Sequence, residues 1–201
     1  MNAAPMNHRA QIAAALLGGL GGAMLVGSPA LAHTGLPAGG LVDGVLHPLR
    51  GADHLLAMVA VGIVAVAARD RRIAWLTPLG FLAGVLAGGG LGLAGVDVPH
   101  IETLIAASVV ILGIGVVAVT GRTGNWLPAV AAAFGTMHGF AHGAEQPAGS
   151  SAWLYVAGFV AVTAALHSSG TVFGLAVRRA GVLRITTGAA ISAAGASLLL
   201  A

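Results

Sequence analysis

The sequence contains no cysteine and no lysine, and it has few charged residues. Asp, Glu, Lys and Arg together make up 7% of its 201 residues, compared with about 25% in an average soluble domain. So few charges cannot cover the surface of a soluble protein. Apolar residues make up 57% of the chain and the mean hydropathy is +0.94. The apolar runs are continuous and do not alternate with period two, so the composition predicts an all-α, polytopic membrane protein.

Each absence excludes a class of site. Without cysteine there are no disulfides, thiolate metal sites, iron–sulfur clusters or cysteine nucleophiles. Without lysine, a phosphate-binding ATPase loop and a Schiff-base cofactor both lack their essential side chain. All nine basic residues are arginine, the net charge is only +3, and no basic run carries interleaved aromatics, so nucleic acid is not an expected partner. We expect no prosthetic group and no ATPase subunit.

Residues 1–32 are typical of a secretory signal peptide. Arg9 precedes an apolar stretch from Ala10 to Val26, and Ala30-Leu31-Ala32 fits the small-residue cleavage rule. We predict cleavage after Ala32, which would start the mature chain, residues 33–201, outside the cytoplasm. An uncleaved first helix is the alternative.

The mature chain divides into six apolar stretches, each of about the length needed to cross a bilayer. They cover residues 41–68, 74–94, 102–119, 126–142, 152–177 and 182–200. Arginine occurs in the connections after the first, third and fifth stretches, and in neither of the other two. Because positively charged loops stay in the cytoplasm, we predict a six-helix bundle in a bacterial inner membrane, with both ends of the mature chain on the periplasmic side.

The first stretch contains ionisable residues, which cost several kcal/mol in a membrane unless they are paired or hydrated. His47 and His54 are seven residues apart and would share one face of a regular helix, and Asp53 precedes His54. Pro48 and Gly51 predict a break in that helix. Transporters use broken helices to build ion sites.

A second group of ionisable residues ends the fourth stretch. His138, His142 and Glu145 follow at i, i+4 and i+7, so we expect them on one helix face. Glu102 opens the third stretch. His167 stands alone beside two serines in the fifth, and we interpret it as an interior histidine with satisfied hydrogen bonds, a translocation ligand being the alternative.

Distances from the arginine-marked helix ends, at about 1.5 Å per residue, predict three levels across the bilayer. The outer mouth would hold His47, Glu102 and Glu145, the next level Asp53, His54 and His142, and the deepest level His138 and His167. Imidazole and carboxylate ligands without sulfur suit Ni²⁺, Co²⁺, Zn²⁺ or Cu²⁺. The predicted metal ligands are His47, Asp53, His54, Glu102, His138, His142 and Glu145.

These residues form two recognisable motifs. Residues 47–54 read H-P-x-x-G-x-D-H and residues 138–145 read H-G-x-A-H-G-x-E. With Glu102, followed by Ser108 and Gly113, they resemble the HupE/UreJ family of nickel/cobalt permeases over essentially the whole mature chain. The resemblance implies uptake of Ni²⁺ or Co²⁺ for metalloenzymes such as hydrogenase or urease. It also implies metal-handling roles for His47, Asp53, His54, Glu102, His142 and Glu145.

The sequence therefore predicts a secondary permease, and not an enzyme, that moves a divalent ion inward. Spans one and four carry the two motifs, which fits a three-plus-three inverted repeat with the site at its interface. The rival prediction is an intramembrane zinc-dependent hydrolase acting on a lipid amide or ester, with ligands drawn from His54, His138, His142 and Asp53. The predicted spread of these ligands over several depths disfavours a single zinc site.

Overall fold

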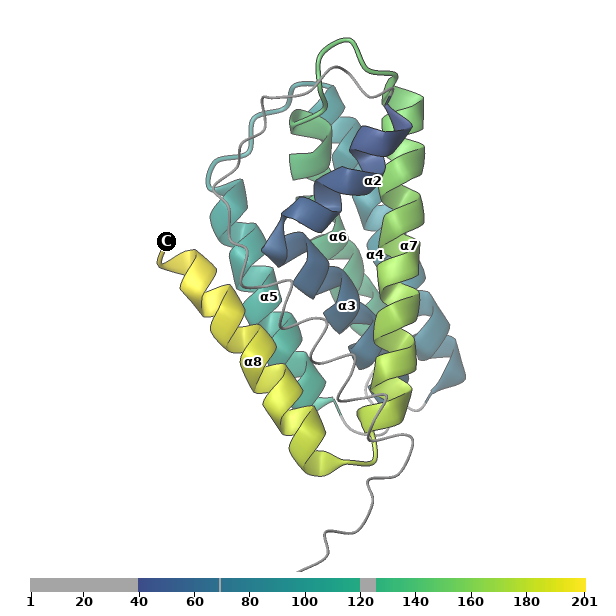
Figure 1. Ribbon diagram of the computed structural model, residues 1–201, viewed down its shortest axis with the longest axis vertical. Coiled ribbons are helices and arrows are strands. Elements are labelled where there is room, and N and C mark those ends of the chain that lie inside the picture. The colour runs from purple at the N-terminus through teal and green to yellow at the C-terminus, as the bar shows by residue number, and fades with distance from the viewer. Residues whose placement is uncertain (1–39, 69, 120–125) are drawn as a thin grey trace, which may run out of the picture. The chain divides into compact units, whose positions relative to one another are not determined.

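The structure, a computed structural model, describes residues 40–68, 70–119 and 126–201, and helices are the regular elements in these ranges. Seven helices and no strand occur in these ranges (Figure 1). They are α2 (Leu41–Arg50), α3 (Ala52–Ala67), α4 (Arg71–Leu93), α5 (Ile101–Ala118), α6 (Leu127–Ala144), α7 (Ala152–Val177) and α8 (Gly181–Leu199). The predicted all-α fold is confirmed, whereas the predicted signal peptide lies outside the described residues.

The helices match the predicted apolar stretches to within a few residues, and the largest difference has a local cause. Helix α4 begins at Arg71, three residues before the predicted start. Asp70 caps it, because its Oδ1 accepts hydrogen bonds from the backbone N of Arg72 at 2.8 Å and of Ile73 at 3.3 Å. An N-cap residue determines where a helix begins, whereas hydropathy marks only its apolar part.

Four of these helices, α4, α5, α7 and α8, are long and apolar enough to cross a membrane, and the bent pair α2–α3 would make a fifth crossing. Leu86, Ile114 and Val172, on three of the four, are half-exposed or more, as expected for lipid contact. Helix α6 does not meet these criteria, because two histidines and three glycines lower the hydropathy of its 18 residues. The chain is a multi-pass membrane protein, and the sixth crossing stays a prediction.

The predicted break in the first span is sharp. Helices α2 and α3 meet at 87°, with Pro48 inside α2 and the break at Gly51. The helix is therefore not regular between His47 and His54, and the shared face that a regular helix would give them does not form. Gly51 has an extended backbone (φ −92°, ψ 115°) that any residue can adopt. A side chain there would displace the Asp53–His54 contact, because a Cβ would lie 2.7 Å from Oδ1 of Asp53 and 3.0 Å from Nδ1 of His54.

Glycines let the helices pack in pairs with their backbones in contact. A Cβ on Gly88 of α4 would collide with the carbonyl oxygen of Thr136 in α6, and a Cβ on Gly139 of α6 would collide with that of Val85 in α4. Such close approach stabilises helix pairs in lipid, where dispersion replaces the hydrophobic effect. The predicted packing role of the four-residue glycine rows is confirmed.

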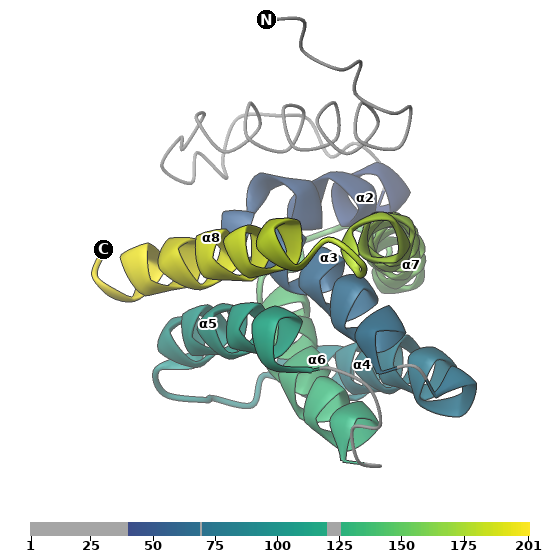
Figure 2. The same ribbon diagram turned by 90° about the horizontal axis from the view of Figure 1, so that it is seen from below.

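Helix α3 lies at the centre of the bundle. It packs against α7, α5 and α4 (Figure 2), and every residue from Leu56 to Ala65 is buried. A helix surrounded in this way holds its N-terminal turn, with Asp53 and His54, against the interior of the protein. The short helix α2 packs on α7 and carries His47.

Candidate functional site

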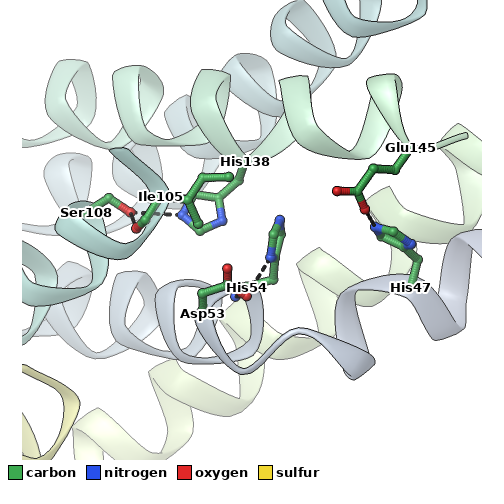
Figure 3. A network of polar contacts seen from close by, with 7 residues as sticks. All are labelled: His47, Asp53, His54, Ile105, Ser108, His138 and Glu145. Atoms are coloured by element: carbon green, nitrogen blue, oxygen red, sulfur yellow. Dashed lines mark hydrogen bonds and ion pairs between the residues drawn. The ribbon is translucent and has the colours of Figure 1, made fainter. Parts of the chain in front are cut away.

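The outermost polar contact joins α2 to the end of α6. His47, in the last turn of α2, donates from Nε2 to Oε2 of Glu145 at 3.0 Å (Figure 3). Glu145 is the residue that follows the last helical residue of α6, so it turns toward α2. The hydrogen bond from His47 lowers the pKa of this half-exposed carboxyl below its ordinary value, and the opposing effect of partial burial is smaller. Glu145 is therefore an anionic residue near His47.

His142 lies between the two halves of the broken helix. Its ring centroid is 4.9 Å from that of His47 and 4.4 Å from that of His54. The 87° bend makes this possible, because it brings a histidine from α2 and another from α3 to the same imidazole of α6. His142 is completely buried, and neither of its ring nitrogens has a hydrogen-bond partner among the described residues.

Asp53 determines how the His54 ring is protonated. Its Oδ1 accepts from the backbone N of His54 at 2.7 Å and lies 2.8 Å from Nδ1 of the same residue (Figure 3). An ionised carboxylate can only accept, so Nδ1 carries the proton. The lone pair is then on Nε2, which is buried and has no partner. A carboxylate behind a histidine is the arrangement that orients imidazoles as metal ligands.

A second pair of contacts assigns the tautomer of His138. Ser108 of α5 donates its hydroxyl proton to the carbonyl oxygen of Ile105 at 2.7 Å, and its Oγ lies 2.9 Å from Nε2 of His138 (Figure 3). The hydroxyl has one proton, so His138 must donate from Nε2. Its free lone pair is on Nδ1, which is buried without a partner. The ring centroid of His138 is 4.8 Å from that of His54.

Glu102 lies apart from these contacts. It is exposed in the first turn of α5 and makes no hydrogen bond or ion pair with any described residue. Asp53, Glu145 and His54 act on its carboxyl only through their charges. The structure therefore brings six of the seven predicted ligands into one series of contacts and leaves Glu102 at its edge.

The six residues form a column, which we name the histidine column. In order, it consists of Glu145, His47, His142, His54 with Asp53, and His138. Within the described ranges, no three His, Asp or Glu side chains are placed to hold one metal ion together. The column thus has neighbouring ligands in contact along its length instead of one enclosed coordination sphere.

Sequence reasoning missed the residues that line the column. In the sequence, Ser108 is only one residue of a family pattern, and nothing there indicates that it orients His138. Helix α7 supplies two aromatic rings four residues apart: Phe159 stacks on His142 at 5.2 Å, and Tyr155 lies 6.0 Å from His47. The four-residue spacing of Tyr155 and Phe159 indicates that they share one face of α7. The spacing does not identify the helix that this face contacts.

Comparison with known proteins gives matches in sequence only. The family described as HupE / UreJ protein matches residues 22–198. A curated relative, Protein HupE of Rhizobium leguminosarum bv. viciae, is 40% identical over 183 residues, which cover 89% of this chain and 94% of the relative. No solved structure matches. By the extent of both matches and by the motif residues that form the column, the chain belongs to the HupE/UreJ family.

Proposed function

We propose that the chain is a secondary permease for a divalent transition-metal ion, Ni²⁺ or alternatively Co²⁺, in the inner membrane of a bacterium. The imported ion would supply a metalloenzyme such as hydrogenase or urease. Membership of the HupE/UreJ family supports this proposal, because the His, Asp and Glu residues of the two motifs at 47–54 and 138–145 are those of the histidine column.

The observation that carries the proposal is the set of buried imidazole nitrogens without partners in His54, His138 and His142. Buried polar atoms are nearly always hydrogen-bonded, and leaving one unpaired costs about 1–3 kcal/mol. Imidazole lone pairs are good ligands for Ni²⁺ and Co²⁺. Nitrogens kept free at this cost, in a row of touching rings, are suited to a cation that binds and leaves.

The charges of the column favour the passage of a cation from Glu145 toward His54. Glu145 is half-exposed and can attract a hydrated cation to His47. His142 and His54 follow, and the carboxylate of Asp53 offsets part of the charge of the ion. A position with few protein ligands binds weakly enough for the ion to move on. Entry of a 2+ ion across 100 mV releases about 4.6 kcal/mol, since each unit charge contributes about 2.3 kcal/mol.

Metal flux into proteoliposomes tests this function. We expect Ni²⁺ or Co²⁺ to enter vesicles containing the full chain when a negative-inside voltage is imposed, and His54→Ala to reduce the rate at least tenfold. Ser169→Ala is a control, because Ser169 is exposed and bonds only to the carbonyl of Ala165 in its own helix. Flux through His54→Ala equal to that of the wild type would refute the proposal. Hydrolysis of a lipid amide or ester without metal flux would favour the hydrolase instead.

A further inference from the structure

His167 of α7 is a buried imidazole that the histidine column does not include. It is 3% exposed, and neither ring nitrogen has a hydrogen-bond partner within the part of the chain that the structure describes. The interpretation of His167 as an interior histidine with satisfied hydrogen bonds is therefore wrong. Two unpaired buried nitrogens need another explanation.

His167 belongs to a stripe of four buried side chains on one face of α7. These residues follow at four-residue intervals, a spacing that aligns side chains along a helix: Tyr155, Phe159, Thr163 and His167. The first two contact His47 and His142. The face of α7 that lines the histidine column therefore continues, two turns further, to Thr163 and His167.

Thr163 also has a polar atom without a partner. Its buried hydroxyl makes no hydrogen bond to any residue in the described ranges, although serine and threonine inside helices commonly bond back to the preceding turn. Two neighbours on α7 do so, since Ser168 donates to the carbonyl of Ala164 at 2.8 Å and Ser169 to that of Ala165 at 2.9 Å. The Thr163 hydroxyl is thus available to a ligand one turn before His167.

Phe81 of α4 connects this region to the end of the histidine column. Its ring centroid is 5.7 Å from that of His138 and 5.1 Å from that of His167, and its side chain is completely buried. The packing of α3 on α7 shows on which side of the histidine column His167 lies, because a Cβ on Gly62 would collide with the carbonyl oxygen of His167. Gly62 lies eight residues beyond His54, or about 12 Å further along the helix, toward the arginines at 69–72.

We propose that His167, together with Thr163, is an inner binding site for the transported divalent metal ion, and that the Phe81 ring is the constriction between this site and His138. The inference rests on the proposed permease function and extends it by a second site. An ion leaving His138 passes the edge of Phe81 and binds the imidazole of His167, with the Thr163 hydroxyl and water as further ligands. One imidazole and one hydroxyl bind weakly, which favours release toward the cytoplasm.

The test compares flux with equilibrium binding in the full-length protein. We expect His167→Ala to lower voltage-driven Ni²⁺ flux into proteoliposomes at least tenfold and to leave the affinity of the histidine column for Ni²⁺ within about twofold of the wild type. Ser168→Ala, which alters the neighbouring exposed residue, should keep wild-type flux. His54→Ala should lose both flux and binding at the column.

The outcomes separate the two proposals. Wild-type flux through His167→Ala, with flux lost in His54→Ala, would refute the inner site and keep the permease. Wild-type flux through both variants would refute both. Should His167→Ala fail to fold, Phe81→Leu replaces it as the test. A smaller side chain at the constriction should raise flux at least threefold without changing binding at the column, and unchanged flux would refute the proposal.

Discussion

At the residue scale, one neighbour determines the tautomer of each of two imidazoles, those of His54 and His138. Asp53 leaves the lone pair of His54 on Nε2, and Ser108 leaves that of His138 on Nδ1. The two histidines therefore expose different ring nitrogens. Both nitrogens are buried and unpaired, and the rings are in edge contact at 4.8 Å. A histidine that is held in one tautomer loses less freedom when it binds an ion, so these neighbours favour metal binding by the column.

We predict that metal uptake falls as the external pH is lowered, because a protonated imidazole cannot bind a metal ion. Glu145 does not cause this loss. Its pKa is lowered by His47, which contacts it, while His54 lowers and Asp53 raises it through charge alone. A carboxyl with a lowered pKa stays ionised until the pH falls below its ordinary range near 4.5, so Glu145 keeps its charge at any pH above that range.

Uptake of radioactive nickel at constant imposed voltage measures this dependence. Glu145→Gln is the matched control: it should reduce the rate of uptake and keep the fall of uptake toward low pH. Uptake in Glu145→Gln that no longer falls toward low pH would show that the carboxyl, and not the imidazoles, titrates. Uptake that increases toward low pH would contradict the prediction and indicate transport together with protons.

At the scale of helices, the α4–α6 pair depends on glycines whose Cβ positions are occupied by backbone. We predict that Gly88→Ala destabilises the protein by about 1–3 kcal/mol, the usual cost of overpacking a close contact, because the added methyl overlaps the carbonyl oxygen of Thr136. Gly90, two residues along α4, has no atom within 4 Å of its Cβ position. Gly90→Ala should be neutral or stabilise the helix by up to about 1 kcal/mol.

Thermal unfolding in detergent, followed by circular dichroism, compares the two variants. The order of stability is the critical result, since both substitutions add one methyl group to the same helix. Equal melting temperatures for Gly88→Ala and Gly90→Ala would mean that α4 and α6 do not pack as closely as their glycines indicate.

The sequence predicted the helices better than the contacts between them. Apolar runs locate the spans, and Pro48 with Gly51 predicts the break, because both signals are local in the chain. The local sequence does not predict the 87° angle at Gly51, because the angle depends on the packing of α3 against three other helices. The contact of Phe81 with His167 joins residues from two different helices, and the spacing of residues within either helix does not predict it.

At the scale of the whole described bundle, the helix pairs follow a two-fold pattern. Helix α4 runs parallel to α6, α3 runs parallel to α7, and α5 is antiparallel to α8. If the first three predicted spans are exchanged with the last three, the α4–α6 pair becomes the α3–α7 pair. The α5–α8 pair is exchanged with itself. Gly113 and Gly188 show the reciprocity, because a Cβ on either would lie 2.7 or 2.6 Å from the carbonyl oxygen of the other. Such contacts are typical of a two-fold axis, as the predicted inverted repeat requires.

The side of the membrane on which each loop lies depends on how many helices cross the membrane. Helix α6 is the helix whose crossing is still a prediction. Between Asp97 and Gly181 lie α5, α6 and α7, so the two residues are on opposite sides of the membrane if α6 crosses and on the same side if it does not. Because the chain has no cysteine, Asp97→Cys and Gly181→Cys each introduce a single thiol, at positions that are both exposed. In spheroplasts, we predict that a membrane-impermeant maleimide labels Asp97→Cys directly and Gly181→Cys only after lysis, since the arginines near Gly181 keep that loop in the cytoplasm. Labelling of both thiols before lysis would mean that α6 does not cross, and the reverse pattern would mean that the whole bundle is inverted and the histidine column opens to the cytoplasm.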